Sequence, residues 1–269
     1  MKRFAWLTDI HLEFLTPWEL DKFLDRLQTE RLDALLLTGD IAQAPMLRSV
    51  LLQMAQQLNI PIYFVLGNHD YYHGSIPKVR TAMTTLTLEK RGLYWLPATG
   101  VVELTTDVGL VGHDGWADGR YGQFLLSPVM LNDYVLIESL RTPSAEERLK
   151  MLNALGDEAA DHLRVVLPKA AQQYRQVLVL VHPPPFSAAC WHNGKIPGED
   201  DIFLPHFGCQ AVGAVLLEIA ALFPQVEFTV LCGHTHGGGR AQITANLLAL
   251  TGAAEYGAPV IQQIFALAG

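Results

Sequence analysis

The sequence Leu66-Gly67-Asn68-His69-Asp70 follows an apolar run, residues 60–65, that is rich in β-branched and aromatic residues. Such a run is too short for a helix and predicts a strand that is buried on both faces. Gly67 permits a sharp turn at the end of this strand. The turn then presents an amide oxygen, an imidazole and a carboxylate, which are groups that bind metal ions or carry protons. Taken alone, the stretch also fits a turn with a structural histidine.

The residues before this turn predict strands that alternate with helices. Apolar runs at residues 4–8 and 34–38 predict two further strands. Between them, Thr16 fits a helix N-cap and is followed by Pro17 and by apolar residues at helical spacing. Pro45 opens a second helical pattern. The order strand, helix, strand, helix, strand is typical of an α/β fold with a parallel sheet and helical crossovers.

The middle of the chain has a less regular pattern. A hairpin is predicted where two short apolar runs flank the turn at residues 106–109. Residues 117–174 begin without a clear period and continue as two expected helices, separated by Gly156, with the second disturbed by Pro168. We interpret this segment as an insertion or cap packed on a single domain that spans residues 1–269.

Five of the predicted strands end in polar residues of the same few kinds. The last third of the chain supplies two of these strands, at residues 177–181 and 228–232, with a helix between them. The residues at the five strand ends are Asp9 and His11, Asp40, Asn68 and His69, His182, and His234 and His236. Ligand sites of open α/β sheets lie outside the carboxyl ends of the strands, so we expect these side chains to meet. Residues two apart on an extended segment, such as Asp9 and His11, point the same way.

Nitrogen and oxygen donors without a thiolate suit Mn²⁺, Fe²⁺/Fe³⁺ or Zn²⁺. The donors exceed what one ion needs, whereas two transition-metal ions that share a bridging carboxylate would use them all. Each residue by itself has a structural alternative: Asp40 as a helix N-cap, His182 as a core histidine, and Asp9 and His11 in a solvated turn. Their coincidence at five strand ends favours a metal site.

Composition restricts the classes of partner. The 50% hydrophobic content is ample for a large core, and the formal net charge of −8, without a basic block, argues against nucleic acid as a partner. The odd number of cysteines, Cys190, Cys209 and Cys232, without a Cys-x-x-Cys spacing, indicates a reducing compartment. Asp9, His11 and Glu13 interrupt the apolar N-terminal run, and no run reaches the ~18 apolar residues of a membrane span. We therefore expect a cytoplasmic protein.

The sequence resembles the calcineurin-like metallophosphoesterases in the order and spacing of five blocks. These blocks are Asp9-Ile10-His11, Gly39-Asp40, Gly67-Asn68-His69-Asp70, His182 and Gly233-His234-Thr235-His236. The resemblance implies a four-layer α/β/β/α sandwich of two mixed β-sheets, with a two-metal site at the strand ends. It assigns one ion to Asp9, His11, Asp40 and His236. It assigns the other ion to Asp40, as the bridge, with Asn68, His182 and His234, and it makes His69 catalytic.

One position departs from the family pattern. Many members carry an acidic residue three positions after the aspartate of the Gly-Asp block, where it can orient the catalytic histidine. Here that position is Gln43. Asp70 is a candidate substitute, and the sequence leaves open which group orients His69.

The resemblance implies a two-metal hydrolase of phosphoester bonds. Two ions about 3.5–4 Å apart would convert a bridging water into the attacking hydroxide and neutralise charge on the phosphoryl oxygens. His69 would donate a proton to the leaving oxygen. We expect a phosphodiesterase that acts on a nucleotide or another small diester; the alternatives are a phosphomonoesterase and an inactive binding module. Candidate substrate contacts are His113, Asp114, Trp116, Trp191, His192 and Asn193.

Overall fold

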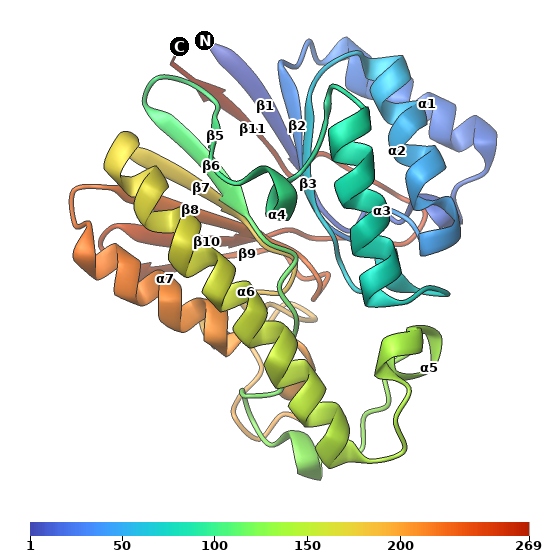
Figure 1. Ribbon diagram of the computed structural model, residues 1–269, viewed down its shortest axis with the longest axis vertical. Coiled ribbons are helices and arrows are strands. Elements are labelled where there is room, and N and C mark those ends of the chain that lie inside the picture. The colour runs from blue at the N-terminus through green and yellow to red at the C-terminus, as the bar shows by residue number, and fades with distance from the viewer. Residues whose placement is uncertain (269) are drawn as a thin grey trace.

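The computed structural model describes residues 1–268, which form four layers (Figure 1). Two mixed β-sheets lie face to face in the middle, and helices cover both outer faces. The predicted four-layer α/β/β/α sandwich is therefore confirmed. Within residues 1–268, no helix has both the length and the apolar character that crossing a membrane requires.

The first sheet is built from the N-terminal part of the chain and one C-terminal strand. Its order is β11-β1-β2-β3-β4, with β11 antiparallel to β1 and the other neighbours parallel. The strands are β1 (Lys2–Leu7), β2 (Ala34–Thr38), β3 (Ile62–Val65), β4 (Leu93–Trp95) and β11 (Gln263–Leu267). The helices on the outer face of this sheet are α1 (Pro17–Thr29), α2 (Ala44–Leu58) and α3 (Ile76–Glu89). The short α4 (Leu96–Thr99) follows the edge strand β4, and its Leu96 joins the cluster between the two sheets. This order confirms the predicted parallel sheet with helical crossovers.

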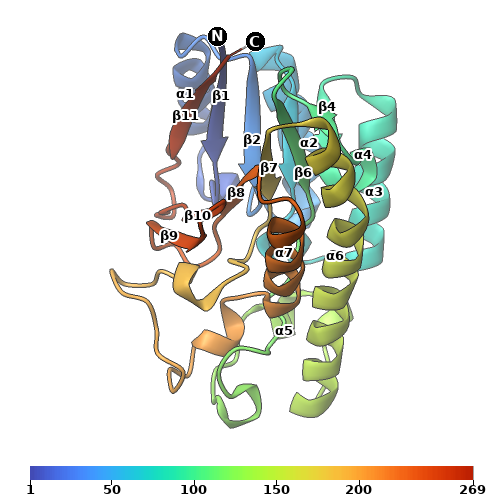
Figure 2. The same cartoon turned by 90° about the vertical axis from the view of Figure 1, so that its left-hand side faces the viewer.

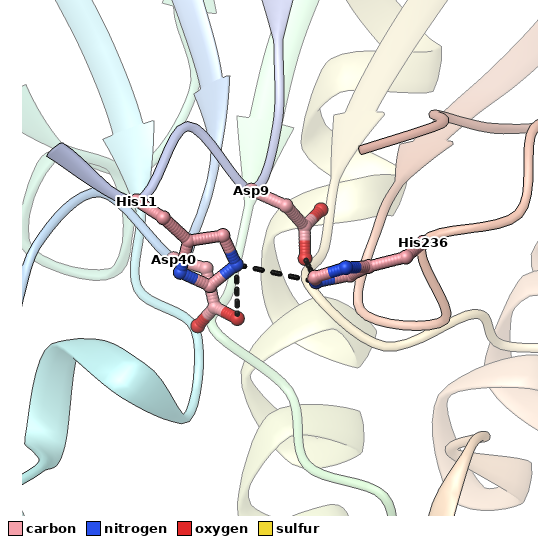
Figure 3. A group of neighbouring side chains, drawn as sticks. All are labelled: Asp9, His11, Asp40 and His236. Carbon is pink, nitrogen blue, oxygen red and sulfur yellow. Dashed lines mark hydrogen bonds and ion pairs between the residues drawn. The ribbon is translucent and has the colours of Figure 1, made fainter. Parts of the chain in front are cut away.

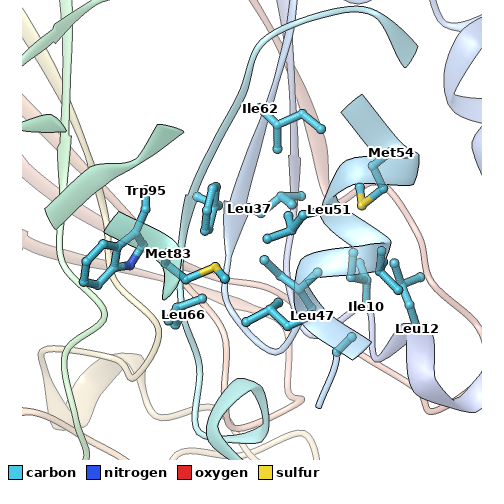
Figure 4. Packing of buried hydrophobic residues seen from close by; sticks show 14 of the residues in the cluster. Ile10, Leu12, Leu37, Leu47, Leu51, Met54, Ile62, Leu66, Met83 and Trp95 are labelled. Carbon is cyan, nitrogen blue, oxygen red and sulfur yellow. The ribbon is translucent and has the colours of Figure 1, made fainter. Parts of the chain in front are cut away.

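The central strands of the first sheet are buried on both faces, as their apolar runs predict. On β1, Leu7 packs in the cluster between sheet and helices, whereas Trp6 belongs to the cluster between the two sheets. Side chains alternate across a strand, so a strand buried on both faces needs apolar residues at every position. Figure 4 shows the helix side, where Leu37 of β2 lies near Leu47 and Leu51 of α2.

Helix α1 begins where the sequence predicts. The Thr16 hydroxyl accepts a hydrogen bond from the backbone N–H of Glu19, and the Glu19 carboxylate accepts one from the backbone N–H of Thr16. This reciprocal pair satisfies two backbone donors and, with Pro17 in the first turn, fixes the start of the helix.

The second sheet has the order β5-β6-β7-β8-β10-β9. Its strands are β5 (Val102–Glu103), β6 (Val108–Gly112), β7 (Gln176–Leu180), β8 (Glu227–Cys232), β9 (Gly239–Thr244) and β10 (Leu247–Thr251). β5 and β6 form the predicted hairpin, and β6, β7, β8 and β10 are parallel. Two helices, α6 (Ala145–Gln173) and α7 (Gln210–Leu222), cover the outer face (Figure 2).

Helix α6 differs from the sequence-based expectation of two helices, because it continues through Gly156 and Pro168. Gly156 does not end the helix; it lets the helix approach Asp118, since a Cβ here would collide with that side chain. Buried Leu163 and Leu167 hold the second half of α6 on the sheet, which offsets the hydrogen bond lost at Pro168. The first half of α6 extends beyond the sheet, beside the short helix α5 (Asp133–Leu136) and its loops (Figure 1).

Candidate metal centre

The carboxyl ends of β1, β2 and β3 in one sheet and of β7 and β8 in the other meet at one end of the sandwich. This arrangement brings together all seven side chains that the sequence predicts as metal ligands. They form two clusters of donor atoms that share one carboxylate.

The first cluster contains Asp9, His11, Asp40 and His236, whose donor atoms all lie within 4.8 Å of one another (Figure 3). The Nε2 atoms of His11 and His236 are 3.2 Å apart. Asp9 Oδ1 is 3.4 Å from His236 Nε2, and Asp40 Oδ2 is 3.7 Å from His11 Nε2. Four donors therefore converge on one point.

The second cluster contains Asp40, Asn68, His182 and His234. The Asn68 Oδ1 atom lies 3.1 Å from His182 Nε2 and 3.0 Å from His234 Nδ1. Asp40 Oδ1 is 3.4 Å from His182 Nε2. Because Asp40 presents Oδ2 to the first cluster and Oδ1 to the second, its carboxylate lies between them.

Backbone carbonyls fix the orientation of two of these imidazoles. His182 Nδ1 donates to the carbonyl of Thr38 at 2.8 Å, and His234 Nε2 donates to the carbonyl of His206 at 2.8 Å. A neutral imidazole carries one N–H, so the other nitrogen of each ring keeps its lone pair. Those lone pairs, on His182 Nε2 and His234 Nδ1, face Asn68 and are available to a metal ion.

Five of the seven residues have left-handed backbone conformations, with φ between 41° and 70°. They are Asp9, His11, Asp40, His234 and His236. This region is sparsely populated for residues other than glycine, although Asp and His tolerate it better than most, and such outliers gather at functional sites. The surrounding structure holds these turns: the backbone N–H of His11 donates to the carbonyl of Asp40, and that of His234 donates to the Asp9 carboxylate.

The glycines beside these residues act in two ways. Gly39 has a φ of 90°, as expected for a tight turn. Gly67 and Gly233 do not have positive φ. Their role is close approach, because a Cβ would collide with the Asp40 carboxylate at Gly67 and with the Asp9 carboxylate at Gly233.

The charges of the site fit divalent cations. Burial would raise the pKa of Asp40, but the imidazoles around it, His182 foremost, hold that pKa below its usual range. Burial likewise opposes ionisation of Asp9, but the contact with His236 and the charge of His182 together lower the pKa of Asp9. Two ionised carboxylates are thus buried side by side, a costly arrangement that bound cations would neutralise.

His69 lies beside the shared carboxylate without joining either cluster. Its backbone N–H donates to Asp40 Oδ1 at 2.8 Å, and its ring stacks on Tyr72 at 4.2 Å. Its Nδ1 atom is 3.6 Å from Glu13 Oε1. Burial would lower the pKa of His69, but the charge of Asp40 and the contact with Glu13 raise it to about 9.

Asp70 does not orient His69, so that sequence-based suggestion is wrong. Its carboxylate accepts hydrogen bonds from the backbone N–H groups of Ile41, Ala42 and Gly67 at 2.7–2.9 Å. It therefore ties the turn after β2 to the turn after β3. Gln43 is the N-cap residue of α2, and the carboxylate nearest the His69 ring belongs to Glu13.

Asn68 is oriented by a residue of the 117–174 segment that the sequence analysis missed. Asp133 Oδ1 accepts hydrogen bonds from Asn68 Nδ2 at 2.9 Å and from the Tyr72 hydroxyl at 2.8 Å. This contact identifies Nδ2 as the outward atom of the amide and leaves Oδ1 facing the histidines. Asp133 had no local signal in the sequence, because it lies in a stretch without periodicity.

A cleft of about 200 Å³ opens over both clusters. Its walls include four of the candidate ligands and the aromatic rings of Tyr72, Phe207 and Tyr256. The lining residues are Asp40, Asn68, His69, Tyr72, Leu131, Asn132, Asp133, His206, Phe207, His234, His236 and Tyr256. A larger hollow of about 810 Å³, between α6 and α7, contains none of the candidate ligands.

None of the six residues predicted as substrate contacts lines this cleft. Asp114 is buried, and its carboxylate accepts from the backbone of Leu66, the Trp95 indole and the Tyr71 hydroxyl. His113 is also buried and accepts from the backbone N–H of Gly115, while Trp116 lies in the core. These three roles are structural.

The other three of these residues belong to the loop after β7. His192 packs on a residue of the cleft wall, with its ring 4.9 Å from that of Phe207. Trp191 packs against Gly239, and Asn193 occupies a turn with a φ of 49°. The cleft walls therefore come from other residues than the sequence suggests.

Comparison with known proteins identifies related sequences and folds. A family model described as calcineurin-like phosphoesterase matches residues 2–238. The phosphopantetheinyl hydrolase PptH from Mycobacterium tuberculosis has a similar structure, with a TM-score of 0.66 and 13% identity over 95% of this chain and 90% of that chain. A dimetal phosphatase from Danio rerio gives a TM-score of 0.54 and 13% identity over 94% of this chain and 87% of that chain. At this identity the two likenesses concern the fold alone. Among curated protein sequences, none matches this chain.

Proposed function

Because the chain belongs to the calcineurin-like phosphoesterase family and is therefore a metal-dependent phosphoester hydrolase, we propose that it is a phosphodiesterase for a nucleotide or another small diester. Asp9, His11, Asp40 and His236 hold one divalent transition-metal ion in this proposal. Asp40, Asn68, His182 and His234 hold the second, with Asp40 as the bridge. The donor atoms of different residues lie 3.0–3.7 Å from one another, and this convergence supports the assignment.

Held by these donors, two Mn²⁺, Fe²⁺/Fe³⁺ or Zn²⁺ ions would favour ionisation of a bound water and would neutralise negative charge on the phosphoryl oxygens. The protein itself supplies the fixed donor set and the cleft that orients the ester. His69, at the wall of the cleft, donates a proton to the leaving oxygen.

The observation that carries the choice of diester is the charge of the cleft. Among the residues of the described chain that line it, none is lysine or arginine. Apart from His69, which gives its proton to the leaving oxygen, these lining residues offer no cationic side chain for the second negative charge of a phosphomonoester, whereas a diester brings only one. The aromatic walls formed by Tyr72, Phe207 and Tyr256 suit an apolar or aromatic ester group in the place of that second charge.

A panel of model esters tests this proposal. With Mn²⁺ added, we expect kcat/KM for bis(p-nitrophenyl) phosphate to exceed that for p-nitrophenyl phosphate by about tenfold or more, equivalent to about 1.4 kcal/mol of transition-state binding. Protein treated with EDTA serves as the control for contaminating metal-independent activity. A preference for the monoester would replace the phosphodiesterase by a phosphomonoesterase on the same site.

Metal content gives the first independent prediction. We expect the purified protein, after incubation with Mn²⁺ or Zn²⁺ and desalting, to retain about two ions per chain, because one shared carboxylate serves two donor sets. Elemental analysis measures the content, and EDTA should remove both the metal and the activity. A content near zero, without rescue of activity by added Mn²⁺, would count against the two-metal assignment.

The 117–174 segment has a place in this proposal. We treat residues 1–269 as a single domain in which this segment acts as an insertion, and Asp133 is its contribution to the metal centre. Asp133→Ala should weaken binding of the metal at Asn68 by about 10–100-fold, because the amide loses the acceptor that fixes its orientation.

Zinc titration of both sites measures this effect. Asp157→Ala is the matched control, since it removes an exposed carboxylate of the same segment that pairs with Arg120. Equal zinc affinity in Asp133→Ala and Asp157→Ala would show that Asp133 does not orient Asn68.

The proposed partner is a small phosphoester, and the proposed location is the cytoplasm. The three cysteines, Cys190, Cys209 and Cys232, are buried and unpaired, which supports a reducing compartment. The formal net charge of −8 supports a small substrate over nucleic acid.

A further inference from the structure

Glu13 has a buried carboxylate whose oxygens accept no hydrogen bond from the described residues. Its side chain is only 6% exposed. An ionised group that is buried without partners is costly and calls for a specific role. Glu13 lies in the turn after β1, two residues beyond His11.

Two imidazole nitrogens face this carboxylate. Glu13 Oε1 is 3.5 Å from His11 Nδ1 and 3.6 Å from His69 Nδ1. Both nitrogens are buried, and neither has another partner in residues 1–268. The two rings lie 4.5 Å apart at 69° to each other, so one carboxylate reaches the near edge of both. Three groups without partners therefore face one another.

We propose that Glu13 is a positioning residue that accepts the Nδ1–H groups of His11 and His69 together. This inference rests on the proposed function, in which His11 is a metal ligand and His69 a catalytic residue. With Nδ1–H directed at Glu13, His11 keeps its Nε2 lone pair toward Asp40 and His236. The same contact holds the His69 ring by one edge while Tyr72 stacks on its face.

The two distances are longer than those of a formed hydrogen bond. Contacts of catalytic groups are commonly long before substrate binds and tighten in the complex. Within residues 1–268, neither Asp70 nor position 43 replaces Glu13 in this role. Asp70 is saturated by backbone N–H groups, and position 43 carries an amide. Glu13 thus couples one metal ligand to the catalytic histidine through a single carboxylate.

The proposal predicts two separable effects of Glu13→Ala. Zinc affinity should fall by about 10–100-fold, because His11 loses the acceptor that fixes its tautomer. At saturating metal, kcat should still be about 10–100-fold lower, because the His69 ring is no longer held in place. Glu13→Gln is nearly isosteric, and its zinc affinity and kcat should lie between those of wild type and Glu13→Ala. Its single carbonyl oxygen can accept one imidazole N–H, but its NH₂ group is a donor and cannot accept the other.

A double-mutant cycle separates positioning from a general structural effect. At saturating zinc, Glu13→Ala added to His69→Ala should lower kcat no further, whereas its effect on zinc affinity should persist through His11. Glu30→Ala, which removes an exposed carboxylate paired with Arg3, is the control for the loss of a glutamate. Thermal melting of each variant confirms that it is folded.

Three outcomes would overturn the proposal. Unchanged zinc affinity in Glu13→Ala would show that His11 does not depend on Glu13. Additive losses of kcat in the double mutant would show that Glu13 does not act through His69. A third bound ion that disappears in Glu13→Ala would make the residue a metal ligand. Zinc affinity is measured without turnover. If only the phosphodiesterase proposal is wrong, diester hydrolysis will be absent while Glu13→Ala still lowers zinc affinity.

Discussion

Asp40→Asn is expected to lose both metal ions and to lower kcat/KM by more than about 10³-fold. Removing a single hydrogen-bond donor that stabilises the transition state costs about 10²–10³-fold. Loss of two metal ions removes more charge stabilisation than that. The Asp40 carboxylate presents one oxygen to each cluster, and a neutral amide bridges two cations poorly. Elemental analysis and kinetics at several Mn²⁺ concentrations measure the effect, which excess Mn²⁺ should only partly restore.

The folded state should survive this substitution. Asn tolerates the left-handed backbone at position 40, where φ is 52°, and it removes a buried charge from beside Asp9. Asp114→Asn is the matched control, because Asp114 is equally buried but belongs to neither cluster and accepts hydrogen bonds from the Leu66 backbone and the Trp95 indole. We expect that control to lower the melting temperature and to keep both metal ions. Wild-type metal content in Asp40→Asn would refute the bridging role.

The strand ends could be predicted from the sequence because two local signals coincide there. Apolar runs without polar interruption mark strands buried on both faces, and polar residues such as Asp40 and His182 directly after them break the run. Parallel strands then carry their last residues to one edge of the sheet, whatever the loops between them do. The fold and the gathering of the ligands therefore follow from patterns that each stretch carries by itself.

The residues that support the ligands could not be predicted in the same way. Asp133 reaches Asn68 across 65 positions of chain, and nothing near either residue indicates that contact. At position 156 a glycine is needed because the side chain of Asp118 packs against the helix there, which is a tertiary contact. In the sequence, a glycine at that place suggests the end of a helix. Glu13 is close to His11 in the sequence, but its second partner, His69, comes from another strand end.

His69→Ala, by contrast with Asp40→Asn, is expected to keep both metal ions while kcat falls by ~10²–10⁴-fold, the usual contribution of a proton donor. His69 lines the cleft, but its Nδ1 atom faces Glu13 and the residue belongs to neither donor cluster. The loss should depend on the leaving group. Alkyl diesters, whose leaving oxygens have a high pKa and need protonation, should slow much more than aryl diesters, which need little.

His192→Ala is the matched control for this prediction, because His192 lies beside Phe207 but does not line the cleft. We expect it to keep both the metal content and the leaving-group dependence of the wild type. If His69→Ala loses metal, His69 is a ligand and the proton donor must be sought among the other residues of the cleft wall. If it keeps metal but slows alkyl and aryl diesters equally, His69 stabilises the phosphoryl group and does not protonate the leaving oxygen.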